Sequence, residues 1–346
     1  MLKFYFSTYP TQIILRGSVK VAKKQPKYRP LKVVEDVLPV VDLLERWHKD
    51  NPCATKKAQL DKAIGYAADS VFKKNRLKAG QRVTVRIRSK VEYETYDCAT
   101  SAMVVVEWKN NKQVYRFSRD FYDMLLDVGN FQIGWSLFKY LPYNSFYLEV
   151  EGHDKIDGIM IRYMQCEGES DSLFYVICCK SDEFPETIGG IADPTETDEY
   201  EKYFKNEIFK AGISETAAQV VLMKEVLAFV FQACMYLCAK NAEIEENPEQ
   251  QRIYRPSTTV RNKFSEIRKW DVGVRVTRDI RKVNGGKPYK PVENSGTRRR
   301  PRQHWRKAHW HTYWIGPKTN QQKAMKFIAP ILVNDNNDDA PVVIHQ

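Results

Sequence analysis

The segment 145-SFYLEVEGHDKIDGIMIRYMQCEGESDSLFYVICC-179 contains three short apolar runs separated by polar, glycine-containing segments. The runs cover residues 145–150, 158–165 and 173–179 and are rich in aromatic and β-branched side chains. Runs of this length and composition, bounded by Gly, Asp and Ser, are typical of β-strands. Their close spacing predicts an antiparallel meander of three strands.

Helical periodicity occurs on both sides of this meander. Apolar residues recur there at three- and four-residue spacing, which is the period of an amphipathic helix. Ser118 stands where the N-cap of one such helix is expected. The pattern predicts helices over residues 31–48, 55–74, 118–128, 200–211 and 214–239.

Alternation of apolar and polar residues predicts further strands. They are expected at residues 82–88, in a hairpin of residues 101–108 and 112–117, and at residues 270–276. Residues 181–198 are interpreted as an acidic loop, and residues 243–259 as a linker.

A second hairpin is expected near the C-terminal end. Trp310, Thr312 and Trp314 alternate with other residues, and this run is expected to pair with residues 325–333 across a turn at 316–322. The whole pattern predicts an α+β fold, in which an antiparallel sheet packs with several helices and a basic C-terminal part ends in a β-hairpin.

Composition limits the class of protein. The 346 residues are 43% hydrophobic, which is enough for a sizeable core and excludes a disordered or collagen-like chain. The longest apolar run, residues 220–239, carries Lys224, Glu225 and Gln232, so we expect no membrane-spanning helix. Polar residues scattered through residues 1–15 argue against a signal peptide.

Cysteine usage indicates the compartment. The seven cysteines include no C-x-x-C pair, so they fit neither a disulfide framework nor a zinc ribbon. We expect reduced and mostly buried thiols, and therefore a reducing compartment, the cytoplasm.

Charge is distributed in blocks along the chain. Lys and Arg balanced against Asp and Glu give +14 for residues 1–90, −16 for 91–251, +17 for 252–327 and −3 for the last nineteen residues, for a net charge of +12. Either the basic ends fold back onto the acidic middle, or they bind an anionic partner. We therefore divide the chain into a basic N-terminal region (1–90), an acidic α+β core (91–251), a basic module rich in Trp, Arg and His (252–334) and a flexible acidic tail (335–346).

The basic module has the composition of a nucleic-acid-binding segment. Its cations attract phosphates, and its flat rings can stack on bases, so RNA is an expected partner. The candidate nucleic-acid-binding residues are Arg298, Arg299, Arg300, Arg302, His304, Arg306, Lys307, His309 and His311.

The histidines of this module allow an enzymatic alternative. On a strand, His309 and His311 share one face with Tyr313, whereas the opposite face, which carries the tryptophans, is interpreted as core. A nuclease could use these two histidines with His304, one of them acting as general base. The spacing is not specific, and the chain has no G-x-S-x-G, Walker A, H-E-x-x-H or G-x-G-x-x-G motif. We assign no catalytic residue and expect neither a metal nor a cofactor.

A second candidate surface is acidic. Carboxylates crowd the segment that follows residue 181, where they could bind a basic peptide or simply form a solvated loop. The candidate peptide-binding residues are Asp182, Glu183, Glu186, Glu196 and Asp198.

The C-terminal run resembles a known family. The order of Arg302, His304-Trp305, His309-Trp310-His311, Tyr313-Trp314 and Gly316 is similar to the C-terminal signature of a type V-A anti-CRISPR family found on phages and plasmids. Further similarity lies at residues 326–330, 141–149 and 270–273. The resemblance covers roughly residues 140–334.

The resemblance implies a function. The anti-CRISPR member of the family recognises the N-terminal peptide of a type V CRISPR effector as that chain emerges from the ribosome, and the effector mRNA is then destroyed. For this chain it implies a peptide-recognising surface in the acidic middle and a basic C-terminal part that meets mRNA or the ribosome. The alternatives are the histidine- or metal-dependent nuclease and a plain nucleic-acid-binding protein of plasmid maintenance. The target peptide and the oligomeric state are left open.

Overall fold

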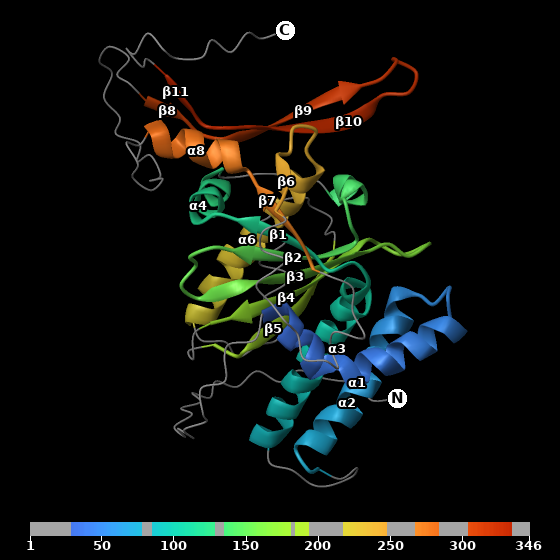
Figure 1. Cartoon of the computed structure of the whole chain (residues 1–346). Helices are drawn as coiled ribbons and strands as arrows, with labels where there is room; N and C mark the ends of the chain where they lie inside the picture. Colours follow the sequence, from blue (N-terminus) through green and yellow to red (C-terminus); the bar gives the residue numbers. More distant parts are fainter. Residues whose placement is uncertain are drawn as a thin grey trace.

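The computed structural model describes residues 29–77, 85–128, 135–180, 184–193, 217–247, 267–283 and 304–333. Within these residues the predicted α+β fold is confirmed. A seven-stranded sheet with the order β5-β4-β3-β2-β1-β7-β6 lies between two layers of helices, and two two-stranded ladders follow at the C-terminal end (Figure 1).

The predicted meander is confirmed. β2 (Ser145–Val150), β3 (Ile156–Met164) and β4 (Ser172–Cys179) pair antiparallel, with Met160 opposite both Tyr147 and Val176. All eight residues of β4 are buried, because helices cover both faces of the sheet. A continuous apolar run is the pattern expected for a strand buried on both sides.

The remaining strands make the sheet mixed rather than purely antiparallel. β1 (Gln113–Phe117) runs parallel to β2 and to β7 (Arg268–Val272), and β6 (Ile244–Glu246) runs antiparallel to β7. The segment interpreted as a linker therefore contributes a strand.

The acidic loop also contains a strand that was not expected. β5 (Thr187–Ala192) pairs with β4 at one edge of the sheet. Its glycines are required by close packing: a Cβ on Gly190 would lie 2.3 Å from the ring of Tyr175, and one on Gly189 would lie 2.9 Å from the Cβ of Thr100. What resembles a turn in the sequence is thus a strand that leaves room for its neighbours.

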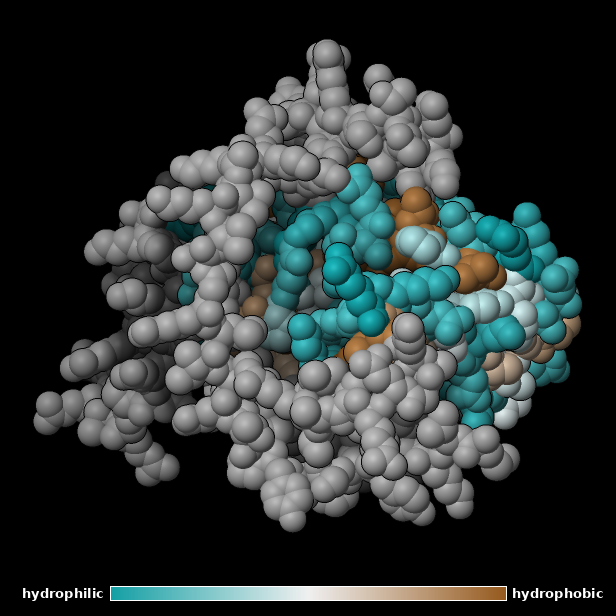
Figure 2. Space-filling view, turned by 90° about the horizontal axis from the view of Figure 1, so that it is seen from below, coloured by the Kyte–Doolittle hydropathy of each residue, from teal (hydrophilic) through white to brown (hydrophobic). Residues whose placement is uncertain are grey.

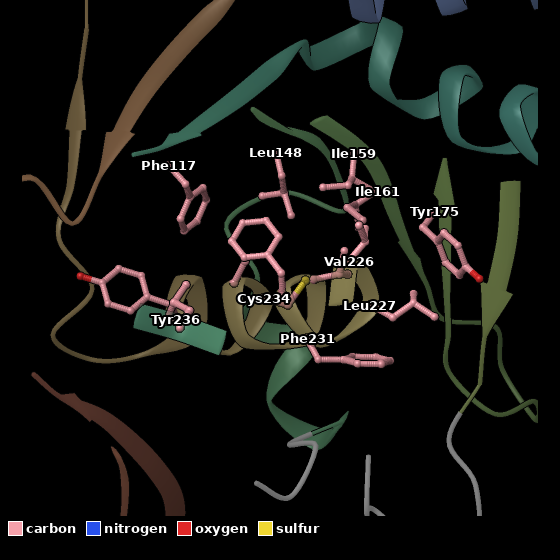
Figure 3. Packing of buried hydrophobic residues seen from close by; sticks show 14 of the residues in the cluster. Phe117, Leu148, Ile159, Ile161, Tyr175, Val226, Leu227, Phe231, Cys234 and Tyr236 are labelled. Atoms are coloured by element: carbon pink, nitrogen blue, oxygen red, sulfur yellow. The ribbon is translucent and has the colours of Figure 1, made fainter. Parts of the chain in front are cut away.

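One face of the sheet is covered by α6 (Ala217–Cys238), α4 (Arg119–Asp127) and the short 3-10 helix η1 (Trp135–Tyr140). Figure 3 shows Leu148, Ile159 and Ile161 extending from the sheet toward α6. The segment Val221–Cys238 is long and apolar enough to cross a membrane by length and composition alone, yet 72% of it is buried within the protein. It is the core helix of this layer.

On the opposite face, α3 (Val85–Asn111) lies against the strands, and α1 (Arg29–Asp50) and α2 (Lys56–Lys74) pack on α3. The predicted helices 31–48 and 55–74 are confirmed, and the Thr55 side chain caps α2 by accepting from the amide of Ala58 at 3.2 Å. Seen from the side on which these helices lie, the described surface is mainly hydrophilic with small separate apolar patches (Figure 2). Their apolar residues are turned inward.

α3 corrects two predictions. The strand expected at residues 82–88 and the first strand of the hairpin expected at 101–108 are wrong where the structure describes them, because residues 85–111 form one helix. Its β-branched run, Val104 to Val106, is buried against the sheet. Tertiary burial outweighs the weak local preference of valine for strands. The second half of the expected hairpin, residues 113–117, is β1, and the predicted helix that begins after the Ser118 N-cap is α4.

α8 (Val274–Val283) corrects the strand expected at residues 270–276, which ends at Val272. Gly273, with φ +67°, breaks the strand, and the carboxylate of Glu243 accepts a hydrogen bond from the Arg275 amide at 3.0 Å. A carboxylate at a helix N-terminus satisfies a free amide and interacts favourably with the helix dipole.

The C-terminal hairpin is confirmed, with a shorter pairing than expected. β9 (His309–Ile315) pairs antiparallel with β10 (Gln322–Ile328), whereas β11 (Ile331–Val333) pairs with β8 (His304–Arg306). The hairpin extends across the top of the molecule in Figure 1, beyond α4 and β6. The predicted helix at 200–211 and the predicted tail at 335–346 lie outside the described residues.

Candidate nucleic-acid interface

The hairpin of β9 and β10 is anchored to the body by aromatic packing. Phe327 of β10 is 3% exposed, and its ring centroid lies 4.9 Å from that of Trp310, 5.4 Å from that of Tyr236 and 6.2 Å from that of Phe121. The indole Nε1 of Trp310 donates to the side chain of Gln232 on α6 at 2.6 Å. The hairpin base is therefore part of the core beside α6.

Backbone contacts fix the same strand. The Asn241 side chain donates to the carbonyl of Phe327 at 2.7 Å and accepts from its amide at 3.0 Å, and the Lys240 amide donates to the carbonyl of Met325 at 3.1 Å. The residues after α6 thus bind β10 much as a third strand would. This pairing holds the hairpin in one orientation.

The two faces of the hairpin differ. Facing pairs such as Trp310 with Phe327 and His311 with Lys326 show that the histidines and Tyr313 share one face and the tryptophans the other. The interpretation of the tryptophan face as core holds for Trp310 and is wrong for Trp314, which is 63% exposed because the hairpin extends beyond the body there.

The hairpin region carries charge of one sign. Residues 304–328 contain five Lys and Arg residues and no Asp or Glu. Among the cationic side chains that the structure describes between residues 252 and 327, four form ion pairs: Lys269 with Glu149, Arg275 with Glu243, Arg281 with Asp120 and Lys307 with Asp127. The side chains of Arg268, Arg278, Arg306, Lys318 and Lys326 are exposed.

The interpretation that the basic ends fold back onto the acidic middle therefore holds for part of their cations, and binding of an anionic partner stays a prediction. The ion pair of Lys307 with Asp127, at 2.9 Å, joins the basic module to the acidic core, as does that of Lys269 with Glu149, at 3.1 Å. At the other end of the chain, Lys56 pairs with Asp193 at 3.1 Å. The exposed cations of the hairpin remain oriented toward solvent, where they can attract a polyanion.

The predicted nucleic-acid-binding residues fall into three groups. Arg298, Arg299, Arg300 and Arg302 lie outside the described residues, and the structure places only the backbone of His304, on β8. Arg306, His309 and His311 are exposed. Lys307 forms an ion pair with Asp127, which leaves its ammonium less available to a ligand.

Two neighbours of His311 were not among the predicted residues. The rings of His311 and Tyr313 are nearly parallel, at 18°, with their centroids 6.2 Å apart, and the ammonium of Lys326 lies 5.2 Å from the centre of the Tyr313 ring. Lys326 faces His311 across the hairpin. The hairpin register would have revealed this grouping, because the spacing that predicts the strands also predicts which side chains share a face.

Of the predicted acidic surface, the structure describes Glu186. Its carboxylate accepts from Arg29 at 2.9 Å and also pairs with Lys32, while the side chain stays 52% exposed. It therefore links the start of α1 to the residue directly before β5. Asp182, Glu183, Glu196 and Asp198 lie outside the described residues, and their role in peptide binding stays a prediction.

A hollow of about 260 Å³ lies at the base of the hairpin, between the end of α6 and α8. Tyr236, Asn241 and Phe327 line it together with the ion pair of Glu243 and Arg275. The Glu243 carboxylate caps α8 and pairs with Arg275, so it is already satisfied within the protein. Among the described residues, no group of three or more His, Cys, Asp and Glu side chains is placed to hold a metal ion.

Comparisons with known proteins agree with the fold and with the C-terminal signature. A solved structure described as "Crystal structure of AcrVA2" matches with a TM-score of 0.53 at 15% identity, over 88% of this chain and 98% of that one; at this identity the likeness concerns the fold. No curated protein matches the chain. The model of the AcrVA2-like family, described as the anti-CRISPR type V subtype A2 family, matches residues 115–335. This match spans more than half of the 346 residues, so the chain belongs to the AcrVA2-like anti-CRISPR family.

Proposed function

We propose that the protein is an anti-CRISPR inhibitor that recognises the nascent N-terminal peptide of a type V CRISPR effector and engages its mRNA or the ribosome, so that the transcript is lost. Membership of the AcrVA2-like family supports the inhibitor role. Coupling to translation requires two surfaces, one that binds the nascent peptide and one that binds a polyanion such as RNA.

The observation that carries the polyanion contact is the cationic segment 304–328, which contains β8 and the hairpin of β9 and β10. Exposed cations such as Arg306, Lys318 and Lys326 lie in a region of 25 residues, 304–328, without a carboxylate. Phosphate neutralisation by such groups gives affinity without sequence preference. That property suits a protein that must engage whichever message encodes its target peptide.

The peptide contact is proposed at the carboxylates that follow β4. Pairing of a peptide with the edge strand β5 is disfavoured, because α3 already occupies that edge. The Tyr93 hydroxyl donates to the carbonyl of Thr187 at 3.0 Å, and the Gly189 amide donates to the carboxylate of Asp97 at 2.8 Å. A peptide is therefore expected to bind through side-chain charge rather than by strand addition.

A reporter experiment tests the coupling. Cells that express the protein receive a reporter whose first codons encode the effector's N-terminal peptide, and the reporter transcript is quantified. One matched reporter encodes the same peptide with synonymous codons, and another keeps the nucleotide sequence but shifts the reading frame. The proposal predicts transcript loss for the first two and none for the frame-shifted message.

The other functions predict different patterns. A nuclease that acts without the peptide would remove the frame-shifted message as well, and a plain nucleic-acid-binding protein would leave all three messages intact. Either result contradicts the proposal. Charge reversal of Arg306 on β8 and Lys326 on β10, Arg306→Glu with Lys326→Glu, is expected to abolish transcript loss. Lys57→Glu, at an exposed charge on α2, is expected to leave transcript loss unchanged.

A further inference from the structure

The exposed face of β9 and β10 carries rings in a regular row. His309, His311 and Tyr313 are two residues apart on one strand, and the rings of the last two are nearly parallel with centroids 6.2 Å apart. Neither ring is needed to hold the hairpin in place, because the anchor is on the opposite face, through Trp310 and Phe327. His309 contacts the carbonyl of Lys307 at 3.2 Å, whereas the rings of His311 and Tyr313 are not part of the anchor.

The spacing of these rings fits a stacked base. Alternate residues of a strand are about 6.6–6.8 Å apart, and bases stack at about 3.4 Å intervals along a nucleic-acid strand. Two parallel rings separated by twice the stacking distance leave room for one flat base between them. The ring centroids of His311 and Tyr313 are 6.2 Å apart, which is shorter than twice the stacking distance, so the two rings must move apart to admit a base. His311 is exposed and Tyr313 is partly exposed, which allows this movement.

A cation lies beside the same pair. Lys326 faces His311 across the hairpin and holds its ammonium 5.2 Å from the centre of the Tyr313 ring. Because residues 304–328 contain no carboxylate, no negative charge of the hairpin itself competes for this ammonium. A base between the rings would bring its own phosphates near Lys326.

We propose that His311 and Tyr313 stack on one base of a single-stranded RNA and that Lys326 contacts the adjoining phosphate. The inference rests on the proposed function, in which the C-terminal part engages RNA, and it names the class of RNA and the residues. A duplex binds less well here, because its bases are already stacked on one another and do not enter between two rings.

The test measures fluorescence anisotropy of a labelled, unstructured RNA of about 12 nucleotides, a length within the usual site sizes for single strands. Loss of the ring in Tyr313→Leu is expected to weaken binding roughly 5- to 150-fold, the range for loss of one base–aromatic stack. Tyr313→Phe keeps the ring and is expected to bind like the wild type. Lys326→Gln is expected to lower the slope of log Kd against log salt by about 0.7, the value for one phosphate contact on a single strand.

Matched controls separate this site from general attraction. Trp314→Leu removes an exposed aromatic ring from the opposite face and is expected to leave Kd nearly unchanged. The same RNA annealed to its complement is expected to bind more weakly, and a DNA strand of the same sequence shows whether the 2′-hydroxyl contributes. Wild-type affinity in Tyr313→Leu, or equal loss in Trp314→Leu, would overturn this inference and leave the proposed function standing. A wild-type protein that binds no RNA would overturn this inference and would restrict the proposed function to a contact with the ribosome.

Discussion

Replacing Phe327 with alanine is expected to release the hairpin from the body. The side chain is 3% exposed and contacts the rings of Trp310, Tyr236 and Phe121. Truncation of a buried phenylalanine costs about 3–5 kcal/mol in lost contacts and cavity. Phe327 also lines the hollow of about 260 Å³ beside α8, so water can enter part of the void, and we expect the lower end, about 3 kcal/mol.

Two measurements locate this loss. Urea unfolding gives the change in the free energy of unfolding, and amide hydrogen exchange reports the opening of β9 and β10. A loss of about 3 kcal/mol corresponds to a roughly 150-fold larger open population. The matched control is Trp314→Ala, an aromatic truncation in the same hairpin at a side chain that is 63% exposed, which is expected to change stability by less than about 0.5 kcal/mol.

The reasoning fails if Phe327→Ala keeps the wild-type free energy of unfolding, or if the amides of β9 and β10 exchange no faster than before. Either result would mean that the hairpin is held by something other than this aromatic anchor. An equally large effect of Trp314→Ala would contradict the assignment of the two faces.

Three further predictions concern the body of the protein. Cys53 is expected to react fast with a maleimide at neutral pH and the other six thiols slowly, because burial raises their pKa values; mass spectrometry of labelled peptides checks this. A hydrogen bond from His153 lowers the pKa of Glu225 below its ordinary 4.5. The ionised carboxylate therefore stabilises the fold above about pH 4.5, and this stabilisation is lost as the pH falls through the lowered pKa. The free energy of unfolding, measured as a function of pH, is expected to fall more steeply in acid for the wild type than for Glu225→Gln. Gly189→Val places a side chain against Thr100, with a Cβ contact of 2.9 Å, and is expected to lower the free energy of unfolding in urea by about 1–3 kcal/mol.

Local periodicity predicted the elements whose environment is regular. The meander of β2, β3 and β4 follows from short apolar runs separated by polar, glycine-containing segments, as expected for strands covered on both faces. The helices α1 and α2 and the pairing of β9 with β10 follow from the spacing of their apolar residues. The run at 101–108 was assigned wrongly for a definite reason. A helix buried along most of its sides has no clear polar face, so its apolar residues resemble a strand.

The sequence predicted the positive charge of the candidate site but not which of its charged residues form ion pairs. Composition identified the cationic, ring-rich segment, but no sequence pattern links Lys307 to Asp127, which lie 180 residues apart. The same holds for the ion pair of Lys56 with Asp193 and for that of Arg29 with Glu186. Which charges are neutralised depends on tertiary contacts. The structure is therefore needed to distinguish the Lys and Arg side chains that form ion pairs from those that face solvent.

Co-sedimentation with translating ribosomes tests the central claim most directly. A lysate that translates the effector message is supplemented with the protein, and sucrose gradients report the fraction found with polysomes. The account predicts association that is lost after RNase treatment and in the variant Arg306→Glu with Lys326→Glu. A protein that stays in the light fractions while the effector is being translated would contradict it.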